Sequence, residues 1–330
     1  MATTQTTAPA RRTGAPAFGE ISSSRRTKNA MMTGLIYGAF ILAVIPLIWL
    51  LATVLIKGID RFMISDAAGR DGGFNLEFLN QTMRGIFGGD APYGGISHAI
   101  VGTLMMTLAA TVISVPVGLL TAIYLVEYGK GWLQKAITFF VDVMTGIPSI
   151  VAGLFAYALF AILVGPGTKL GIVGAIALSV LMIPVVVRSS EEMLRLVPNE
   201  LREASYALGV PKWLTVLKVV LRTSIAGITT GITLAIARVV GETAPLLVAV
   251  GVADSLNWNL FDGRMMSLPV YIISEYEAGA IPCSPDDAAC IAQIPEYRAW
   301  AAALVLILIV MALNLVARLI AKFFSPKSGR

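Results

Sequence analysis

Two charged residues at helical spacing stand inside a long apolar segment. Arg238 and Glu242 lie four residues apart in residues 223–252, which carry no other charge. Side chains at i and i+4 share one face of a helix, so these two could pair. An arginine at the centre of a membrane helix costs about 2.5–3.5 kcal/mol and therefore faces a protein interior or a water-filled path. The pair indicates either a pathway for an anion or a buried ion pair that only locks helices together.

Three further polar residues are assigned to the same pathway. Asp142 lies nearer the first end of residues 136–164, and Ser149 lies further along that segment. Thr243 follows Glu242 directly. The predicted pathway residues are therefore Arg238, Glu242, Thr243, Asp142 and Ser149.

Prolines near these residues predict interruptions of the helices. Pro245 removes the hydrogen bond that would reach the Gly241 carbonyl and should loosen the helix beside Glu242. Pro148 should start a new helical segment, with Thr145 or Ser149 helping to satisfy nearby amides. Exposed amides at such a helix start would favour an anion.

The composition indicates an all-α integral membrane protein. Of the 330 residues, 56% are hydrophobic and 14% charged, and the mean hydropathy is +0.78. Soluble chains are nearer 25% charged. Unbroken apolar runs near or above 20 residues favour helices over a barrel of short alternating strands. We predict six transmembrane helices, at residues 31–56, 98–126, 136–164, 170–188, 223–252 and 299–321.

Basic residues predict the orientation. With the N-terminus inside, seventeen lysines and arginines fall in inner segments and seven in outer segments, while Arg238 lies within a span. The positive-inside rule places both termini and the 189–222 loop in the cytoplasm. Residues 1–30 are predicted to be a disordered cytoplasmic tail and residues 325–330 a second short tail. The net charge of +5 does not indicate nucleic-acid binding, because the basic residues form no single patch.

The two cysteines lie on the predicted outer side. Cys283 and Cys290 fall in the outer loop 253–298, with six residues between them. An oxidising compartment would allow a disulfide, and two free thiols are the alternative.

Several kinds of site are excluded. No phosphate-binding Gly-x-x-x-x-Gly-Lys-Ser/Thr loop occurs, so the chain has no such loop for ATP. No protease or hydrolase nucleophile motif occurs either. His98 is the only histidine and cannot build a metal site alone, so we expect it to be an interfacial residue at the outer edge of the second span.

The 189–222 loop predicts two short helices joined by a bend. Helix-forming stretches flank Gly209 and Pro211, which together end one helix and turn the chain. Small side chains around Ala204 and Ser205 would let the first helix seat closely in a groove of another protein. An ordinary amphipathic interfacial hairpin is the alternative.

The same loop resembles the EAA motif of ABC importer permeases. The match covers Glu203-Ala204-Ser205, Gly209 after three further residues, and Val219 with Leu221. Ser205 stands where alanine is usual, and Arg222 where proline is usual. Two further strings, Gly146-Ile-Pro-Ser-Ile-Val-Ala-Gly153 and Ala237-Arg-Val-Val-Gly-Glu-Thr-Ala-Pro-Leu-Leu247, resemble the permeases of phosphate importers. The resemblance covers roughly residues 98–324, the expected permease core, and not residues 31–97, the first helix and outer loop.

The resemblance implies a subunit that catalyses no reaction itself. Such permeases lie in the bacterial inner membrane and pair with a second permease subunit, two copies of a cytoplasmic ATPase and an extracytoplasmic phosphate-binding protein. Glu203, Ala204, Ser205 and Gly209 would dock the ATPase. No cofactor is expected in this chain, since ATP and Mg²⁺ would be bound by the partner ATPase.

The cargo prediction combines the resemblance with the charge pair. Arg238 would lower the barrier for an anion, and Glu242 could accept a hydrogen bond from phosphate, which carries a proton near neutral pH. Sulfate has no such proton, so the pair suits phosphate better. A permease for another oxyanion such as sulfate or molybdate remains an alternative. An ion-coupled secondary transporter is a second one, although paired repeats with broken helices are not evident.

Overall fold

A computed structural model describes residues 23–66, 73–283 and 289–324. The chain divides into two compact units, Met1–Ala52 and Thr53–Arg330, and helix α1 (Ser23–Asp60) passes from the first into the second. Most of the predicted N-terminal tail and all of the predicted C-terminal tail lie outside the described residues. Residues 23–30, which the tail prediction included, already belong to α1.

The described part of the first unit is the apolar stretch of α1. Large apolar side chains are exposed all along it, among them Leu35, Phe40 and Trp49. A helix that is apolar on every face is typical of a membrane span. This agrees with the predicted span at residues 31–56.

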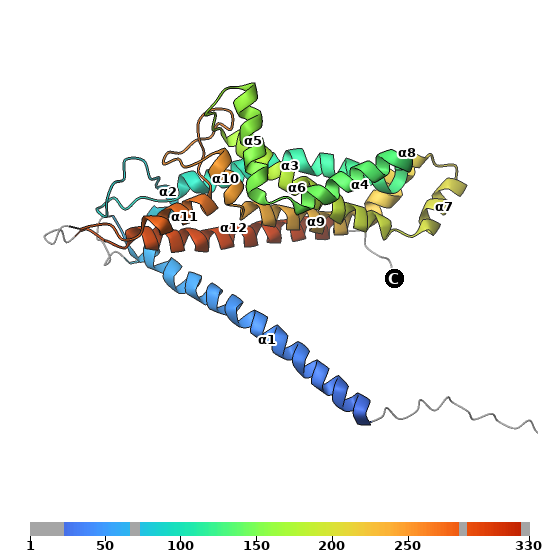
Figure 1. The fold of residues 1–330 in the computed structure, drawn as a ribbon, viewed down its shortest axis with the longest axis horizontal. Helices are drawn as coiled ribbons and strands as arrows, with labels where there is room; N and C mark the ends of the chain where they lie inside the picture. The colour runs from blue at the N-terminus through green and yellow to red at the C-terminus, as the bar shows by residue number, and fades with distance from the viewer. Residues whose placement is uncertain (1–22, 67–72, 284–288, 325–330) are drawn as a thin grey trace, which may run out of the picture. The chain divides into compact units, whose positions relative to one another are not determined.

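The second unit is built from helices of very different lengths (Figure 1). Long helices α3, α6, α9 and α12 lie side by side, with α6 packed between α3 and α9 and with α12 against α9. Helix α7 lies beyond one end of them, next to α8. The elements are η1 Arg61–Met63, α2 Glu77–Asn80, α3 Ser97–Ile123, η3 Tyr124–Tyr128, α4 Gly131–Gly146, α5 Ser149–Leu163, α6 Gly171–Arg195, α7 Asn199–Ala207, α8 Lys212–Thr215, η4 Val216–Val220, α9 Leu221–Val240, α10 Ala244–Ala249, α11 Leu268–Ala278 and α12 Ile294–Phe324.

Small residues set the spacing of α6 and α9. A Cβ atom added at Gly231 would lie 2.5 Å from the Ser189 side chain, which is far inside van der Waals contact. The two backbones therefore approach closely at this level, as is common between membrane helices. This contact fixes the register of α9 against α6.

Five helices are long and apolar enough to cross a membrane among the described residues. They fall at 23–63, 97–128, 171–195, 212–240 and 294–319. Four of the predicted spans are confirmed in position, whereas the helix at the fifth begins earlier than predicted and ends at Val240 instead of residue 252.

The third predicted span, 136–164, is not one straight helix. Helices α4 and α5 meet at an angle of 108°. Pro148 cannot donate a backbone hydrogen bond and disfavours helical geometry at the residue before it. Ile147 is accordingly extended, with φ −71° and ψ 131°. The segment is thus a broken span or a re-entrant loop.

Buried arginines help to hold together the segments that the sequence predicts to be outer. Arg61 is fully buried and donates to the carbonyls of Ile64 and Gly94, each at 2.8 Å. Its guanidinium also lies 5.1 Å from the Phe78 ring centroid, in a cation–π contact. Backbone carbonyls and a ring thus compensate a charge that has left water.

A second buried arginine pairs with a carboxylate. Arg298 Nε lies 2.7 Å from Glu275 Oε2, and Arg298 also donates to the Tyr93 carbonyl at 3.1 Å. Burial raises the pKa of the Glu275 carboxyl above its usual range, although Arg298 opposes the shift. The pair joins α11 to α12.

The two cysteines and His98 were also predicted to lie on the outer side. A disulfide joins Cys283 and Cys290, as predicted, with the two Cα atoms 5.8 Å apart. His98 lies in the first turn of α3 but is buried, with its ring edge-on to Tyr271 at 5.7 Å. The expectation of an interfacial histidine was therefore wrong, because the outer segments cover this end of α3.

Loss of the buried Arg298–Glu275 pair should destabilise the protein far more than loss of the exposed Lys57–Glu296 pair. Arg298→Met should destabilise the chain by about 3–5 kcal/mol, since it leaves Glu275 buried without its partner. Lys57→Met is the matched control, because Lys57 and Glu296 form an exposed pair at 2.9 Å, which solvent screens, so its loss should change the stability much less. Thermal unfolding in detergent measures both. Equal losses of stability in the two variants would show that the Arg298–Glu275 pair matters no more than the exposed pair, and would contradict its structural role.

Candidate functional site

The fifth predicted span is interrupted beside its charged residues. Helix α9 ends at Val240, where Gly241 and Glu242 donate to the carbonyls of Arg238 and Val239 in a tighter closing turn. Helix α10 begins at Ala244 with Pro245 in its first turn. The span predicted at 223–252 is therefore divided into two helices beside Glu242. The interruption precedes Pro245, which starts the next helix instead of loosening the previous one.

This interruption changes where Arg238 lies. Arg238 is in the last turn of α9, not midway along a span. Its Nε is 4.0 Å from Glu242 Oε1, and the two side chains are 55% and 18% exposed in this chain. Because Glu242 follows Arg238 by only four residues along the chain, their contact does not join α9 to another helix. The pair is open to whatever lies next to this chain in a membrane.

The two strings that resemble phosphate importers meet in space. Helix α5 packs against α10, and a Cβ atom added at Gly153 would lie 2.6 Å from the Pro245 Cα atom. Only glycine permits so close an approach. The segment that carries Glu242 and Thr243 is thereby held next to the helix that Ser149 begins.

The start of α5 is only partly as predicted. Pro148 precedes the first helical residue, Ser149, which confirms a new helical segment at this proline. Thr145 does not help to cap it, because its hydroxyl donates to the Val141 carbonyl at 2.9 Å within α4. Hydroxyls inside helices commonly bond back in this way.

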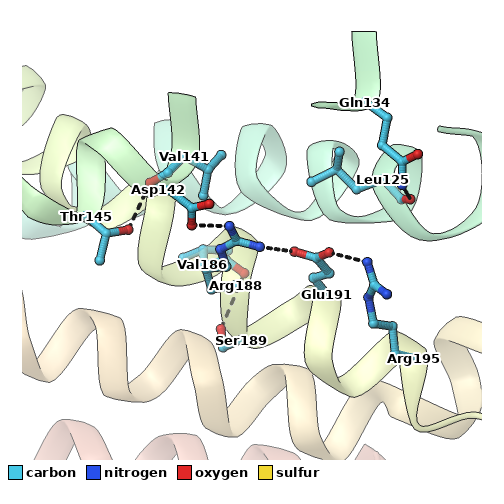
Figure 2. A network of polar contacts seen from close by, with 10 residues as sticks. All are labelled: Leu125, Gln134, Val141, Asp142, Thr145, Val186, Arg188, Ser189, Glu191 and Arg195. Atoms are coloured by element: carbon cyan, nitrogen blue, oxygen red, sulfur yellow. Dashed lines mark hydrogen bonds and ion pairs between the residues drawn. The ribbon is translucent and has the colours of Figure 1, made fainter. Parts of the chain in front are cut away.

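Asp142 takes part in a chain of ion pairs that links α4 to α6 (Figure 2). Arg188 contacts Asp142 on one side and Glu191 at 2.8 Å on the other. Glu191 is nearly buried and also contacts Arg195 at 2.7 Å. The structure pairs Asp142 with Arg188, and its place in a pathway stays a prediction.

The packing of α9 on α6 relates this chain of charges to Arg238. Gly231 lies against Ser189, the neighbour of Arg188. Arg238 is seven residues beyond Gly231, which corresponds to about 10 Å along α9. Two arginines, Arg188 and Arg238, therefore stand at different depths of the same helix pair.

The 189–222 loop has the predicted two helices and bend. Helix α7 ends at Ala207, Gly209 turns the chain with φ +77°, and Pro211 precedes α8. Glu203 and Ala204 are exposed, whereas Ser205 is buried with its hydroxyl 2.9 Å from that of Thr215. The first part of the loop simply extends α6 to Arg195.

Sequence reasoning missed the residues that anchor this loop. Arg202, beside Glu203, pairs with Glu127 at the end of η3 at 2.9 Å. Neither residue was assigned a role from the sequence. They are 75 residues apart, so no local spacing could have connected them.

The chain is similar to proteins of known families. Residues 114–330 match the family of binding-protein-dependent transport system inner membrane components. The phosphate transport system permease protein PstA 1 of Mycobacterium tuberculosis is 45% identical over 95% of this chain and 93% of its own length. The PstA protein of Pasteurella multocida is 38% identical over 92% of this chain and 97% of its own.

A solved structure supports the same fold. One permease chain of the inward-facing MetNI methionine ABC transporter superposes with a TM-score of 0.51 at 19% identity, covering 70% of this chain and 95% of that one. With the helices, the interrupted span and the relatives taken together, this multi-pass membrane protein belongs to the PstA family of binding-protein-dependent permeases.

Proposed function

We propose that this chain is the PstA-type permease subunit of an ATP-driven importer of inorganic phosphate. The observation that carries the proposal is 45% identity, over almost the whole of both chains, to a protein named as a phosphate transport permease. The interrupted α9 with its exposed arginine supports it, because an anion crossing a membrane needs a compensating positive charge.

In this proposal Arg238 and Glu242 share the recognition of the cargo. Arg238 attracts the phosphate anion where the surroundings have a low dielectric constant. Glu242 accepts a hydrogen bond from the proton that phosphate carries near neutral pH. An anion without a proton meets an unpaired carboxylate there and is repelled. Thr243 and Ser149, held close by the contact of α5 with α10, complete the polar lining.

The rest of the transporter is supplied by other chains. A second, PstC-like permease would cover the exposed side of Arg238 and form the other half of the pathway. An ATPase that binds ATP and Mg²⁺ would dock on the exposed face of α7. A phosphate-binding protein would deliver cargo from outside, and both termini of this chain would lie in the cytoplasm of a bacterium.

Removing the positive charge tests the pathway. Arg238→Gln should reduce phosphate uptake to the background of vesicles without the transporter, while the complex still assembles and hydrolyses ATP. Uptake of labelled phosphate into proteoliposomes measures this. Arg264→Gln is the control, because Arg264 is an exposed arginine of an outer loop. Normal uptake by Arg238→Gln would leave Arg238 with a structural role only.

Neutralising Glu242 tests the selectivity. Glu242→Gln should lower phosphate uptake about tenfold, in line with a hydrogen bond to a charged group worth about 1.5–3 kcal/mol. The glutamine amide can donate as well as accept, so sulfate should now compete with phosphate for uptake. Competition by unlabelled sulfate, compared between wild type and variant, measures the change. Unaltered exclusion of sulfate would place the selectivity elsewhere.

A substitution at Gly209, in the bend of the 189–222 loop, tests ATPase docking. Gly209→Asp should weaken co-purification of the ATPase about tenfold, because a side chain in this left-handed conformation costs about 1–2 kcal/mol and protrudes where the partner would sit. Gly131→Asp is a matched control, since Gly131 also has a positive φ, at 70°, with open space around it. The same loss in both variants would argue against docking at α7.

A further inference from the structure

The guanidinium of Arg202 joins three elements at the inner end of the chain. Arg202 belongs to α7 and contacts Glu127 of η3 through Nε at 3.0 Å and through a terminal nitrogen at 2.9 Å. Its terminal nitrogens also donate to the carbonyls of Leu194 at 3.0 Å and Val197 at 2.5 Å. Leu194 lies in the last turn of α6 and Val197 just beyond it, where the helix no longer supplies the usual N–H partners.

The contact between Arg202 and Glu127 is buried. The Arg202 and Glu127 side chains are only 12% and 5% exposed. Arginine presents its donors in a rigid planar fork, so filling these acceptors together fixes the position of α7. An ion pair on the surface would leave α7 free to shift, whereas the buried Arg202–Glu127 pair holds it in place.

A second basic residue holds the same end of η3. Lys212 of α8 donates to the backbone carbonyl of Glu127, and its ammonium lies 4.8 Å from the Tyr128 ring centroid. Both helices of the 189–222 loop, α7 and α8, therefore bond to the last turn of the α3–η3 span.

Helix α7 presents two different faces. Glu203 and Ala204 are exposed, whereas Arg202 and Ser205, three residues apart on one side of the helix, are turned inward. Ser205 bonds to Thr215 of the second helical segment, and Arg202 bonds to α6 and η3. A force applied to the exposed face passes directly through the bonds of the inner face.

We propose that Arg202 and Glu127 are positioning residues that transmit the movement of α7 to the α3–η3 and α6 helices. The inference rests on the proposed docking of an ATPase at α7. ATP-driven displacement of α7 pulls on the ends of two spans through this pair. Without it, α7 still binds the ATPase but moves independently of the helices that form the pathway.

The ratio of phosphate imported to ATP hydrolysed tests the proposal. The complete transporter, with both permeases, the ATPase and the binding protein, is reconstituted with Glu127→Gln or with Arg202→Lys in this chain. The ATPase should co-purify and hydrolyse ATP as in wild type, while the ratio falls about tenfold, within the range of ordinary coupling energies. Arg195→Gln is the control, since the Arg195 side chain is itself exposed, pairs only within α6 at the same end, and should leave the ratio unchanged.

Three results would overturn the inference. An unchanged ratio in both variants would show that the pair transmits nothing. Loss of the ATPase from both variants, with uptake and hydrolysis falling together, would make the pair a requirement for docking or folding. An equal fall in the Arg195→Gln control would show that any charge change at this end has the same effect. Failure of the ATPase to co-purify with the wild-type chain would instead refute the proposed function itself.

Discussion

The site depends on the interruption of a membrane helix beside a charged residue. Backbone groups in a membrane must find partners within the protein, so a helix can stop inside it only where other elements cover the break. Here the chain closes α9 with a tight turn at Gly241, and Pro245 of the next helix packs on Gly153 of α5. This contact places Arg238 at a helix end, open to a neighbouring surface, instead of in the middle of a closed helix.

Arginines outside this break have different partners at each level of the molecule. At one end of the helices, Arg61 donates to backbone carbonyls and Arg298 pairs with Glu275. Toward the other end, Arg188 links α4 to α6, and Arg202 links the 189–222 loop to α6 and η3. A count of basic residues predicts which side of the membrane they occupy. It does not distinguish solvated charges from those that hold helices together.

The sequence predicted the helices well because membrane spans are long, apolar and locally encoded. The bend at Gly209 was also predictable, since a Gly-x-Pro step has few alternatives. The interruptions were harder, because proline alone does not decide them. Pro46, Pro116 and Pro184 all lie inside continuous helices, whereas Pro148 and Pro245 begin new ones. What differs is tertiary packing, such as the contact of α5 with α10, and a single sequence does not reveal it. The Arg202–Glu127 pair was missed for the same reason.

We propose that this chain forms half of an ATP-driven pathway selective for phosphate. Uptake of labelled phosphate by the reconstituted wild-type transporter, with ATP supplied on the ATPase side and unlabelled anions in excess, tests it most directly. We expect uptake that requires ATP and is suppressed by unlabelled phosphate but not by sulfate or molybdate. Uptake without ATP, or equal suppression by sulfate, would contradict it.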